Sequence, residues 1–245
     1  MRPEAAISVL AGTPTLKDRW QVPPAKLVLD GTDVHLWRGL LDLTFTQYAK
    51  AISSLTAEDL ARAAEYRFER ERLRCIATRA TLRGILCRYV GGTPRGVQLS
   101  HDEGSKPTLI EGSDHKIHFN VSHAGRLMIC AVARSEVGVD IERCPSNIQR
   151  EEILRLMFPS VAITEESEKG RDSEFVKLWT RTEAILKLDG CGLARIGMHP
   201  CAMSPAETGL TYEYFEPEQA YLGAVAWRGG EMNLQYWLWS FASTE

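Results

Sequence analysis

The sequence lacks the features that mark several common classes of protein. Its 29 Lys and Arg residues nearly balance its 32 Asp and Glu residues, so the formal net charge is only −3. A dedicated nucleic-acid-binding protein usually carries a clear basic excess, so we expect no nucleic-acid partner. The longest uncharged apolar run, Leu127 to Ala133, is far shorter than the roughly 20 residues that span a bilayer, so we expect no membrane role.

Paired cysteines are also missing. None of the six cysteines belongs to a CxxC pair, which argues against a zinc ribbon or a thioredoxin-like redox site. The first residues contain no apolar segment of a secretory signal, so we expect reduced thiols and a cytoplasmic location.

The composition that remains is that of an ordinary globular protein. Hydrophobic residues make up 44% and charged residues 25% of the 245-residue chain. This length fits one large domain or two small ones. We expect an extended N-terminal arm over residues 1–32, an N-terminal half over 33–120 and a C-terminal half over 121–245, the two halves acting as one functional unit.

The spacing of apolar residues predicts an α+β fold. Expected helices cover 68–90, a charged region 150–173 broken at Phe158-Pro159, and 174–188, and a shorter helix starts at the Thr56–Asp59 capping box. Expected strands cover 34–37, 118–122, 127–133, 137–142, 220–227 and 234–239. The short turn at 134–136 predicts a hairpin between its flanking strands. The order of elements indicates two similar halves, each a small, mostly antiparallel sheet packed with helices.

The segment from Gly138 to Glu142 carries the most distinctive chemistry. Strand alternation puts Asp140 and Glu142 on one face, about 6–7 Å apart, while Val137, Val139 and Ile141 face the core. Two carboxylates at that spacing can reach one hard cation such as Mg²⁺, particularly with a third ligand from elsewhere. Taken alone, the segment is more simply explained as the solvated edge of a sheet.

A second pair of charged residues lies on the helix expected at 174–188. Glu183 and Lys187 are four residues apart and project from the same face. They could hold a metal and a phosphate oxygen side by side. Taken alone, they fit a surface ion pair worth about 0.2–0.5 kcal/mol.

Three further segments could bind an anion. Ser122 and His123 end a strand, and Lys106 stands in a tight Gly104–Pro107 turn. Between positions 62 and 88, eight arginines face three glutamates, a local excess of +5. The arginine-rich stretch is either a solvated helix face or a surface for phosphate groups or an acidic partner.

Taken together and in this order, these segments resemble the 4′-phosphopantetheinyl transferases of the larger, surfactin-synthetase-activating type. The motifs Gly-x-Lys-Pro, Phe-Asn-x-Ser-His, Gly-x-Asp-x-Glu and Trp-x-x-Lys-Glu-Ala-x-x-Lys correspond to 104–107, 119–123, 138–142 and 179–187. The resemblance extends over roughly residues 33–228 and is specific in 104–190.

The resemblance implies two halves related by a pseudo-twofold axis, with coenzyme A in the cleft between them. It implies Mg²⁺-dependent transfer of the phosphopantetheine arm to a serine of an acidic acyl or peptidyl carrier protein, with release of adenosine 3′,5′-bisphosphate, by a monomer. The implied Mg²⁺ ligands are Asp140, Glu142 and Glu183. The implied catalytic residues are Glu183, Asp140 and Lys187. The implied coenzyme contacts are Arg62, His101, Lys106, Asn120, Ser122, His123 and Lys187.

One position departs from the family pattern. Thr182 stands where the family has a lysine just before the motif glutamate. Either that lysine is dispensable, or Arg181 substitutes for it, or activity is weaker; we favour the first. The segment 158–174, where the family contacts its carrier, shows no transferable pattern. Two alternatives stay open: a non-catalytic coenzyme A-binding homologue and a Mg²⁺-dependent phosphohydrolase. Phosphohydrolases often carry denser Asp clusters or a glycine-rich phosphate loop, and this sequence has neither.

Overall fold

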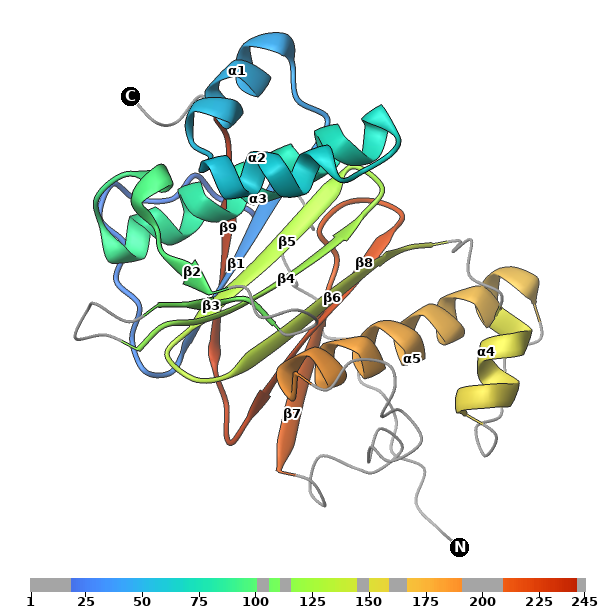
Figure 1. Cartoon of the computed structure of the whole chain (residues 1–245). Helices are drawn as coiled ribbons and strands as arrows, with labels where there is room; N and C mark the ends of the chain where they lie inside the picture. The colour runs from blue at the N-terminus through green and yellow to red at the C-terminus, as the bar shows by residue number, and fades with distance from the viewer. Residues whose placement is uncertain are drawn as a thin grey trace, which may run out of the picture.

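Two sheets form the centre of the protein (Figure 1). This computed structural model describes residues 19–100, 106–110, 116–144, 150–158, 167–190 and 209–241. The larger sheet has the order β4-β5-β1-β9 and the smaller one the order β6-β8-β7. Their strands are β1 (Asp33–Leu40), β4 (His118–Ala124), β5 (Leu127–Ala133), β6 (Val137–Arg143), β7 (Leu210–Phe215), β8 (Tyr221–Arg228) and β9 (Asn233–Leu238). All neighbours pair antiparallel except β1 and β9, which are parallel.

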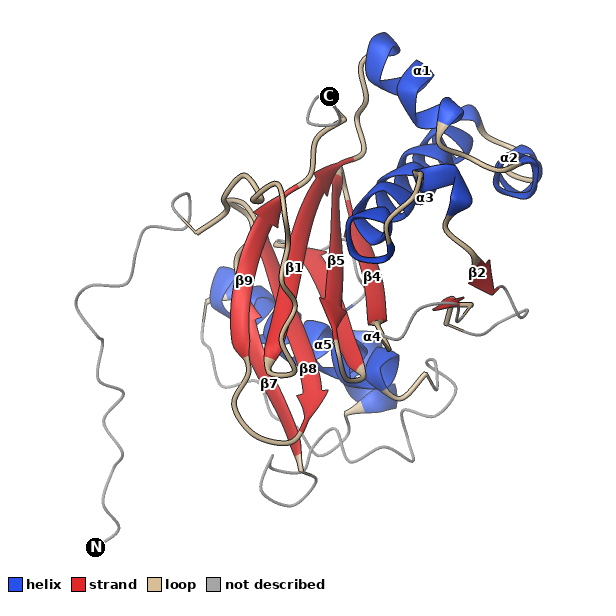
Figure 2. Ribbon diagram, turned by 90° about the vertical axis from the view of Figure 1, so that its left-hand side faces the viewer, coloured by secondary structure: helices blue, strands red, loops and turns tan. Residues whose placement is uncertain are grey.

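The helices are α1 (Phe45–Ser53), α2 (Ala57–Ala64), α3 (Glu69–Val90), α4 (Arg150–Met157) and α5 (Glu168–Leu188). Helix α3 packs on the outer face of the large sheet and α5 on that of the small sheet, while α1 and α2 pack on α3. Figure 2 shows α1, α2 and α3 grouped at one end of the sheets, apart from α4 and α5. A short 3₁₀ helix (Pro94–Gly96) and a two-stranded ribbon of β2 (Leu99–Ser100) and β3 (Thr108–Leu109) follow α3. The α+β fold class is confirmed.

Strand β5 explains why the structure is layered. All seven of its residues are buried, because the strand is covered on both faces. Leu127, Ile129 and Ala131 face the core between the two sheets. Met128 and Cys130 alternate with them and face α3. The order across the protein is therefore α3, large sheet, small sheet and α5.

A buried ion cluster ties α2 to α3. The Asp59 carboxylate, fully buried, accepts hydrogen bonds from Arg79 and Arg83. Arg83 also donates to the carbonyl of Val97, 2.7 Å away, and so anchors the chain after α3. Burial acts to raise the pKa of Asp59, but hydrogen bonds from the Thr56 amide and from Arg83 and Arg79 lower it to about 2. Thr56 caps α2 with the predicted capping box.

The predicted hairpin between 127–133 and 137–142 is wrong. Strand β5 already has β4 and β1 on its two edges, so residues 134–136 carry the chain from the large sheet to the small one, where β6 pairs with β8. The predicted boundary between helices at 173/174 is also wrong, because α5 begins at Glu168, after a Ser167 cap. Residues 159–166 lie outside the described residues.

Three further expectations concern the N-terminal arm, the boundary between the halves and the absence of a membrane span. Residues 1–18 of the expected arm lie outside the described residues, whereas Trp20 is buried in the core between the sheets. The division at residues 120/121 stays a prediction; β4 spans that position. Among the helices that the structure describes, none is long and apolar enough to cross a membrane.

Side chains join β4 to β6, which belong to separate sheets. The side-chain oxygen of Asn120 accepts a hydrogen bond from the Val139 amide at 2.8 Å. The hydroxyl of Ser122 accepts one from the Ile141 amide at 3.4 Å. Two amides on the free edge of β6 are thus paired without a backbone ladder. We call this contact the β4–β6 seam.

A buried histidine makes stability depend on pH. His35, fully buried on β1, lies 2.8 Å from the hydroxyl of Tyr89, and burial lowers its pKa to about 4 although Asp33 and Asp30 oppose the shift. Below about pH 6.5 the unfolded chain binds a proton at His35 while the folded chain stays neutral. This contribution to stability is therefore complete above pH 6.5 and is lost as the pH falls toward 4.

We expect His35→Gln to reduce the acid sensitivity. Between pH 7 and pH 5 the wild type should lose about 1.5 kcal/mol more unfolding free energy than the variant, since each pH unit in this window costs up to about 1.4 kcal/mol. Urea unfolding of both proteins at the two pH values measures the difference. An equal loss in the two proteins would contradict the assignment.

The contact between β6 and α5 depends on Gly138. A Cβ atom at this position would overlap the carbonyl oxygen of Ala184 and the backbone nitrogen of Leu188. We expect Gly138→Ala to lower the unfolding free energy by about 1–3 kcal/mol, because backbone atoms cannot yield as a flexible side chain does. Gly31→Ala is the control, since a Cβ at Gly31 has no described heavy atom within 4 Å. Equal urea midpoints for both variants would refute the tight contact.

Candidate active site

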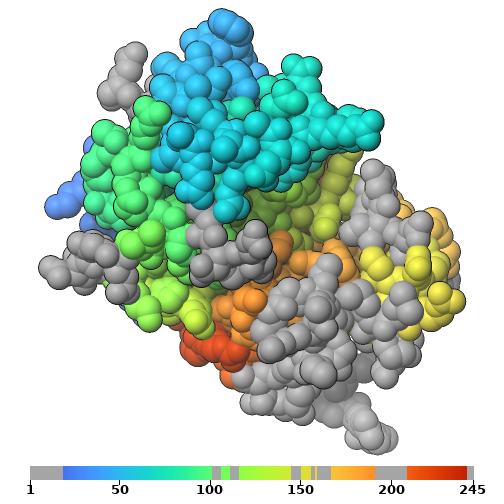
Figure 3. All heavy atoms as spheres, viewed as in Figure 1, coloured from blue at the N-terminus to red at the C-terminus, as the bar shows by residue number. Residues whose placement is uncertain are grey.

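A cavity of about 430 Å³ lies where β4, β6 and α5 meet. Its lining residues are Val121, Ser122, His123, Asp140, Ile141, Glu142, Trp179, Glu183 and Lys187. Three elements that are far apart in the sequence therefore supply one concave, charged site. Figure 3 shows α5 (orange) facing α2 and α3 (cyan), with part of the strand surface (olive) between them.

The local structure follows from two periodicities. Alternation along β6 buries Val139 between the sheets and turns Asp140 and Glu142 toward α5 and the cavity. On α5, Glu183 and Lys187 are one turn apart, so both reach the same cavity.

Asp140 is the most buried charged group of the site, with 3% of its surface exposed. Its Oδ1 atom accepts hydrogen bonds from Ser122 Oγ at 2.7 Å and from Lys187 Nζ at 2.6 Å. Its Oδ2 atom is buried and accepts no hydrogen bond from any described residue. Burial raises the pKa of Asp140, and the Lys187 ammonium acts in the opposite direction.

Two more carboxyl groups share the cavity. Burial, followed by the charge of Asp140, raises the pKa of Glu142 to about 7. The same two causes raise the pKa of Glu183. Trp179 Nε1 donates to Glu142 Oε1 at 3.2 Å and orients that group. Among the described lining residues, three crowded carboxyl groups thus share one lysine, an arrangement that an added cation would stabilise.

The site offers the donor set that a hard divalent cation prefers. Its oxygen ligands are carboxylates, and Asp140 Oδ2 is a buried acceptor without a described donor. As the side chains lie, however, no three His, Cys, Asp or Glu residues within the described ranges converge to hold a metal ion. Lys187 occupies Asp140 Oδ1 instead.

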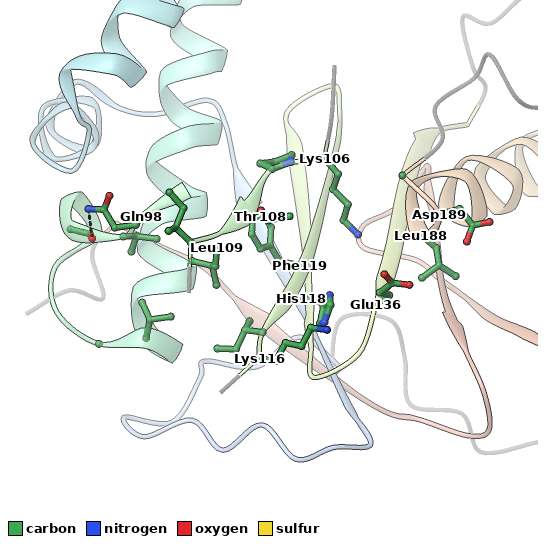
Figure 4. Close-up of a pocket in the computed structure, with 18 residues that line it drawn as sticks. Gln98, Lys106, Thr108, Leu109, Lys116, His118, Phe119, Glu136, Leu188 and Asp189 are labelled. Carbon is green, nitrogen blue, oxygen red and sulfur yellow. Dashed lines mark hydrogen bonds between the residues drawn. The ribbon is translucent and has the colours of Figure 1, made fainter. Parts of the chain in front are cut away.

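A second cavity, of about 610 Å³, lies among the end of α3, β3, the start of β4 and the end of α5 (Figure 4). It is lined by Val90, Gly91, Gly96, Val97, Gln98, Lys106, Pro107, Thr108, Leu109, Ile110, Lys116, Ile117, His118, Phe119, Glu136, Leu188, Asp189 and Gly190. Lys106 extends toward β6 and donates to the Val137 carbonyl at 2.7 Å. Burial lowers its pKa to about 8.

Residues close in sequence line the two cavities. Along β4, Phe119 lines the second cavity and Ser122 the first, and along α5, Leu188 lines the second and Lys187 the first. The first is mainly charged. The second combines apolar walls with a few polar groups. The pair could accommodate an elongated ligand with a charged centre and a less polar arm.

Six of the residues predicted for the site come together in the first cavity: Ser122, His123, Asp140, Glu142, Glu183 and Lys187. Lys106 lines the second cavity. Asn120 forms the β4–β6 seam, and Arg62 lies on α2 near Glu58, 3.7 Å away. His101 lies outside the described residues.

Several arginines of the arginine-rich stretch are engaged within the fold. Arg79 and Arg83 bind the buried Asp59, and Arg88 donates to the Pro24 carbonyl. Fewer positive charges are therefore available to a ligand than the +5 excess in the sequence indicates.

The structure also bears on the missing family lysine. Thr182 is fully buried, on the inward side of α5. Arg181 lies over the ring of Tyr212 on β7, with its guanidinium carbon 5.3 Å from the ring centre, and does not line the first cavity. This placement argues against a substitution of Arg181 for the lysine.

Sequence reasoning missed two parts of the site. Trp179 had a place in the motif but no role, and its hydrogen bond to Glu142 joins residues 37 positions apart. Lys116 and His118 line the second cavity, although no role was predicted for either residue. No local pattern announces either contact, because both depend on how β4, β6 and α5 meet.

Comparison with known proteins agrees with this geometry. The family model for the 4′-phosphopantetheinyl transferase N-terminal region matches residues 42–135. The model for the 4′-phosphopantetheinyl transferase superfamily matches residues 136–231. The two matches meet where the chain passes from the large sheet to the small one.

Bacterial proteins named 4′-phosphopantetheinyl transferase are similar to this chain. The chain is 29% identical to the 4′-phosphopantetheinyl transferase HetI of Nostoc sp. over 234 residues, which cover 91% of this chain and 99% of the relative. It is 30% identical to 4′-phosphopantetheinyl transferase Sfp of Bacillus subtilis over 117 residues, 46% of this chain and 50% of the relative. Matches of both family models, next to each other and in order, show that the chain is a transferase of the 4′-phosphopantetheinyl transferase superfamily.

Proposed function

We propose that the protein binds coenzyme A along the two cavities and transfers its phosphopantetheine arm to a serine of an apo carrier protein, releasing adenosine 3′,5′-bisphosphate. The observation that supports this most is the buried Asp140 Oδ2, which has no donor among the described residues, in a cavity to which those residues bring three carboxyl groups and one lysine. Splitting a pyrophosphate requires its charge to be neutralised and its phosphorus to be held in line with the attacking hydroxyl.

We assign the divalent cation, Mg²⁺, to Asp140, Glu142 and Glu183. When bound, it would neutralise the pyrophosphate charge. The carboxylates supply hard oxygen ligands, and Trp179 keeps Glu142 oriented. Ser122 holds Asp140 by a 2.7 Å hydrogen bond.

The chain's own residues then account for the proton and the leaving group. Glu183, whose pKa is raised by burial and by Asp140, is the base that takes the proton of the carrier serine. The serine oxygen bonds to the phosphorus nearer the pantetheine arm, and the bond from that phosphorus to the bridging oxygen breaks. Lys187 stabilises the negative charge on the departing phosphate.

The second cavity supports a position for the pantetheine arm. Its apolar walls, Leu109, Phe119 and Leu188 among them, suit the gem-dimethyl and methylene groups of the arm. Its polar groups, such as Lys106 and Gln98, suit the amides. The arm would extend from the pyrophosphate in the first cavity along β4 and α5.

We expect Asp140→Asn and Glu183→Gln each to reduce carrier modification by at least about 100-fold, because each removes a group that acts on the reacting phosphate or serine. The assay mixes enzyme, a panel of apo carriers, coenzyme A and Mg²⁺, and reads the mass gain of the carrier. Chelation should stop the reaction and added Mg²⁺ should restore it.

Glu69→Gln, at an exposed carboxylate on α3, is the matched control and should keep the wild-type rate. Circular dichroism checks that each variant is folded. Wild-type rates in both site variants would overturn the assignment. Cleavage of coenzyme A without a carrier would instead identify a phosphohydrolase, and coenzyme binding without transfer would identify a non-catalytic homologue.

The position of the arm has its own test. We expect Leu109→Glu to weaken coenzyme A binding about tenfold by placing a charge against the apolar arm, while binding of adenosine 3′,5′-bisphosphate, which lacks the arm, stays unchanged. Isothermal titration calorimetry measures both ligands. Leu40→Glu, 46% exposed on β1 and outside both cavities, is the control. Equal weakening for the two ligands, or none for either, would argue against this position of the arm.

A further inference from the structure

The ammonium group of Lys187 lies among the carboxyl groups of the first cavity and offsets part of their negative charge. Its Nζ atom is 2.6 Å from Asp140 Oδ1, 3.1 Å from Ser122 Oγ and 4.0 Å from Glu183 Oε2. Burial lowers the pKa of His123, the other basic residue among the described residues that line the cavity, and this shift favours its neutral form. Lys187 is therefore the main positive charge on the walls of the first cavity.

The carboxylate that Lys187 binds is also the one best suited to a metal. Asp140 Oδ1 already accepts two hydrogen bonds, and only Oδ2 is free of described donors. A divalent cation at Asp140 would lie beside the ammonium group, and two positive charges a few ångströms apart in a buried site repel strongly. Without coenzyme, the positive charge of Lys187 therefore weakens the binding of a metal ion.

The side chain of Lys187 is able to leave. It is 30% exposed, whereas Asp140 is almost completely buried, and its four-carbon stem can rotate without movement of α5. The ligand that would attract it is the coenzyme pyrophosphate, which offers the negative oxygens that the ammonium loses on leaving Asp140.

We propose that Lys187 is a resident counter-ion of Asp140 that competes with the divalent cation, so that the protein alone binds the metal weakly and coenzyme A relieves the competition. This inference deepens the proposed function and rests on it. Metal and coenzyme then bind with positive coupling, and each raises the affinity for the other by the same factor. Lys187 would thus set metal affinity in addition to contacting the pyrophosphate.

The test measures Mn²⁺ binding, read as the loss of the free-ion signal in electron paramagnetic resonance, without and with coenzyme A. Without coenzyme, we expect Lys187→Gln to bind Mn²⁺ at least about fivefold more tightly than the wild type, since the competing charge is gone. Coenzyme A should raise Mn²⁺ affinity by a smaller factor in this variant than in the wild type.

Matched variants separate this effect from a general change in charge. Lys177→Gln removes an exposed lysine from the same helix and should leave Mn²⁺ affinity unchanged. Lys187→Arg keeps the positive charge and should not bind more tightly than the wild type. If Lys187→Gln is poorly stable, the rise of its unfolding temperature on adding Mn²⁺ should still exceed that of the wild type.

The proposed competition between Lys187 and the metal is wrong if Lys187→Gln binds Mn²⁺ no more tightly than Lys177→Gln does. Failure of this proposal alone would appear as metal-dependent carrier modification by the wild type with no gain of Mn²⁺ affinity in Lys187→Gln. Failure of the proposed function would appear as no carrier modification by the wild type, whatever the Mn²⁺ result.

Discussion

The β4–β6 seam is the contact on which the arrangement of the whole site depends. Asn120 and Ser122 replace a backbone ladder between two sheets and fix how β6 is placed against β4. Ser122 bonds both to the Ile141 amide and to the carboxylate of Asp140. The Ser122 hydroxyl therefore holds β6 in place and also orients the carboxylate of Asp140. Gly138 completes the arrangement by letting α5 approach β6.

The site carries an electrostatic cost that the rest of the fold has to offset. Three carboxyl groups are drawn out of water into one cavity, and burial is the leading cause of the raised pKa of each. The ion cluster around Asp59 shows the opposite design, because there the Thr56 amide and two arginines bind one carboxylate and its pKa falls to about 2. The first cavity keeps its excess of carboxyl groups, and the proposed cation site rests on that excess.

The sequence predicted the parts of this structure that follow from local pattern. Alternation along β6 gave the correct faces for Asp140 and Glu142, and the capping box at Thr56 gave the start of α2. Helix α1 was missed although Thr44 and Gln47 form a similar capping box. Strand β7 was missed as well.

What could not be predicted depends on contacts between distant segments. The short 134–136 turn favoured a hairpin, but pairing was decided by the strands that already flank β5. The arginine-rich stretch looked like a charged pole until Asp59, 20 and 24 positions away, was found to engage Arg79 and Arg83.

The return of β9 to the large sheet has a consequence for how the two halves could be separated. The two family matches divide the chain at residues 135/136, yet β9 lies beyond that point and pairs in parallel with β1 along Asp33–Arg38. An N-terminal fragment that ends at this boundary would lack β9 and expose one edge of β1, and an exposed strand edge promotes aggregation. Each half therefore depends on the other for a complete sheet, because the last strand of the chain closes the edge of the first.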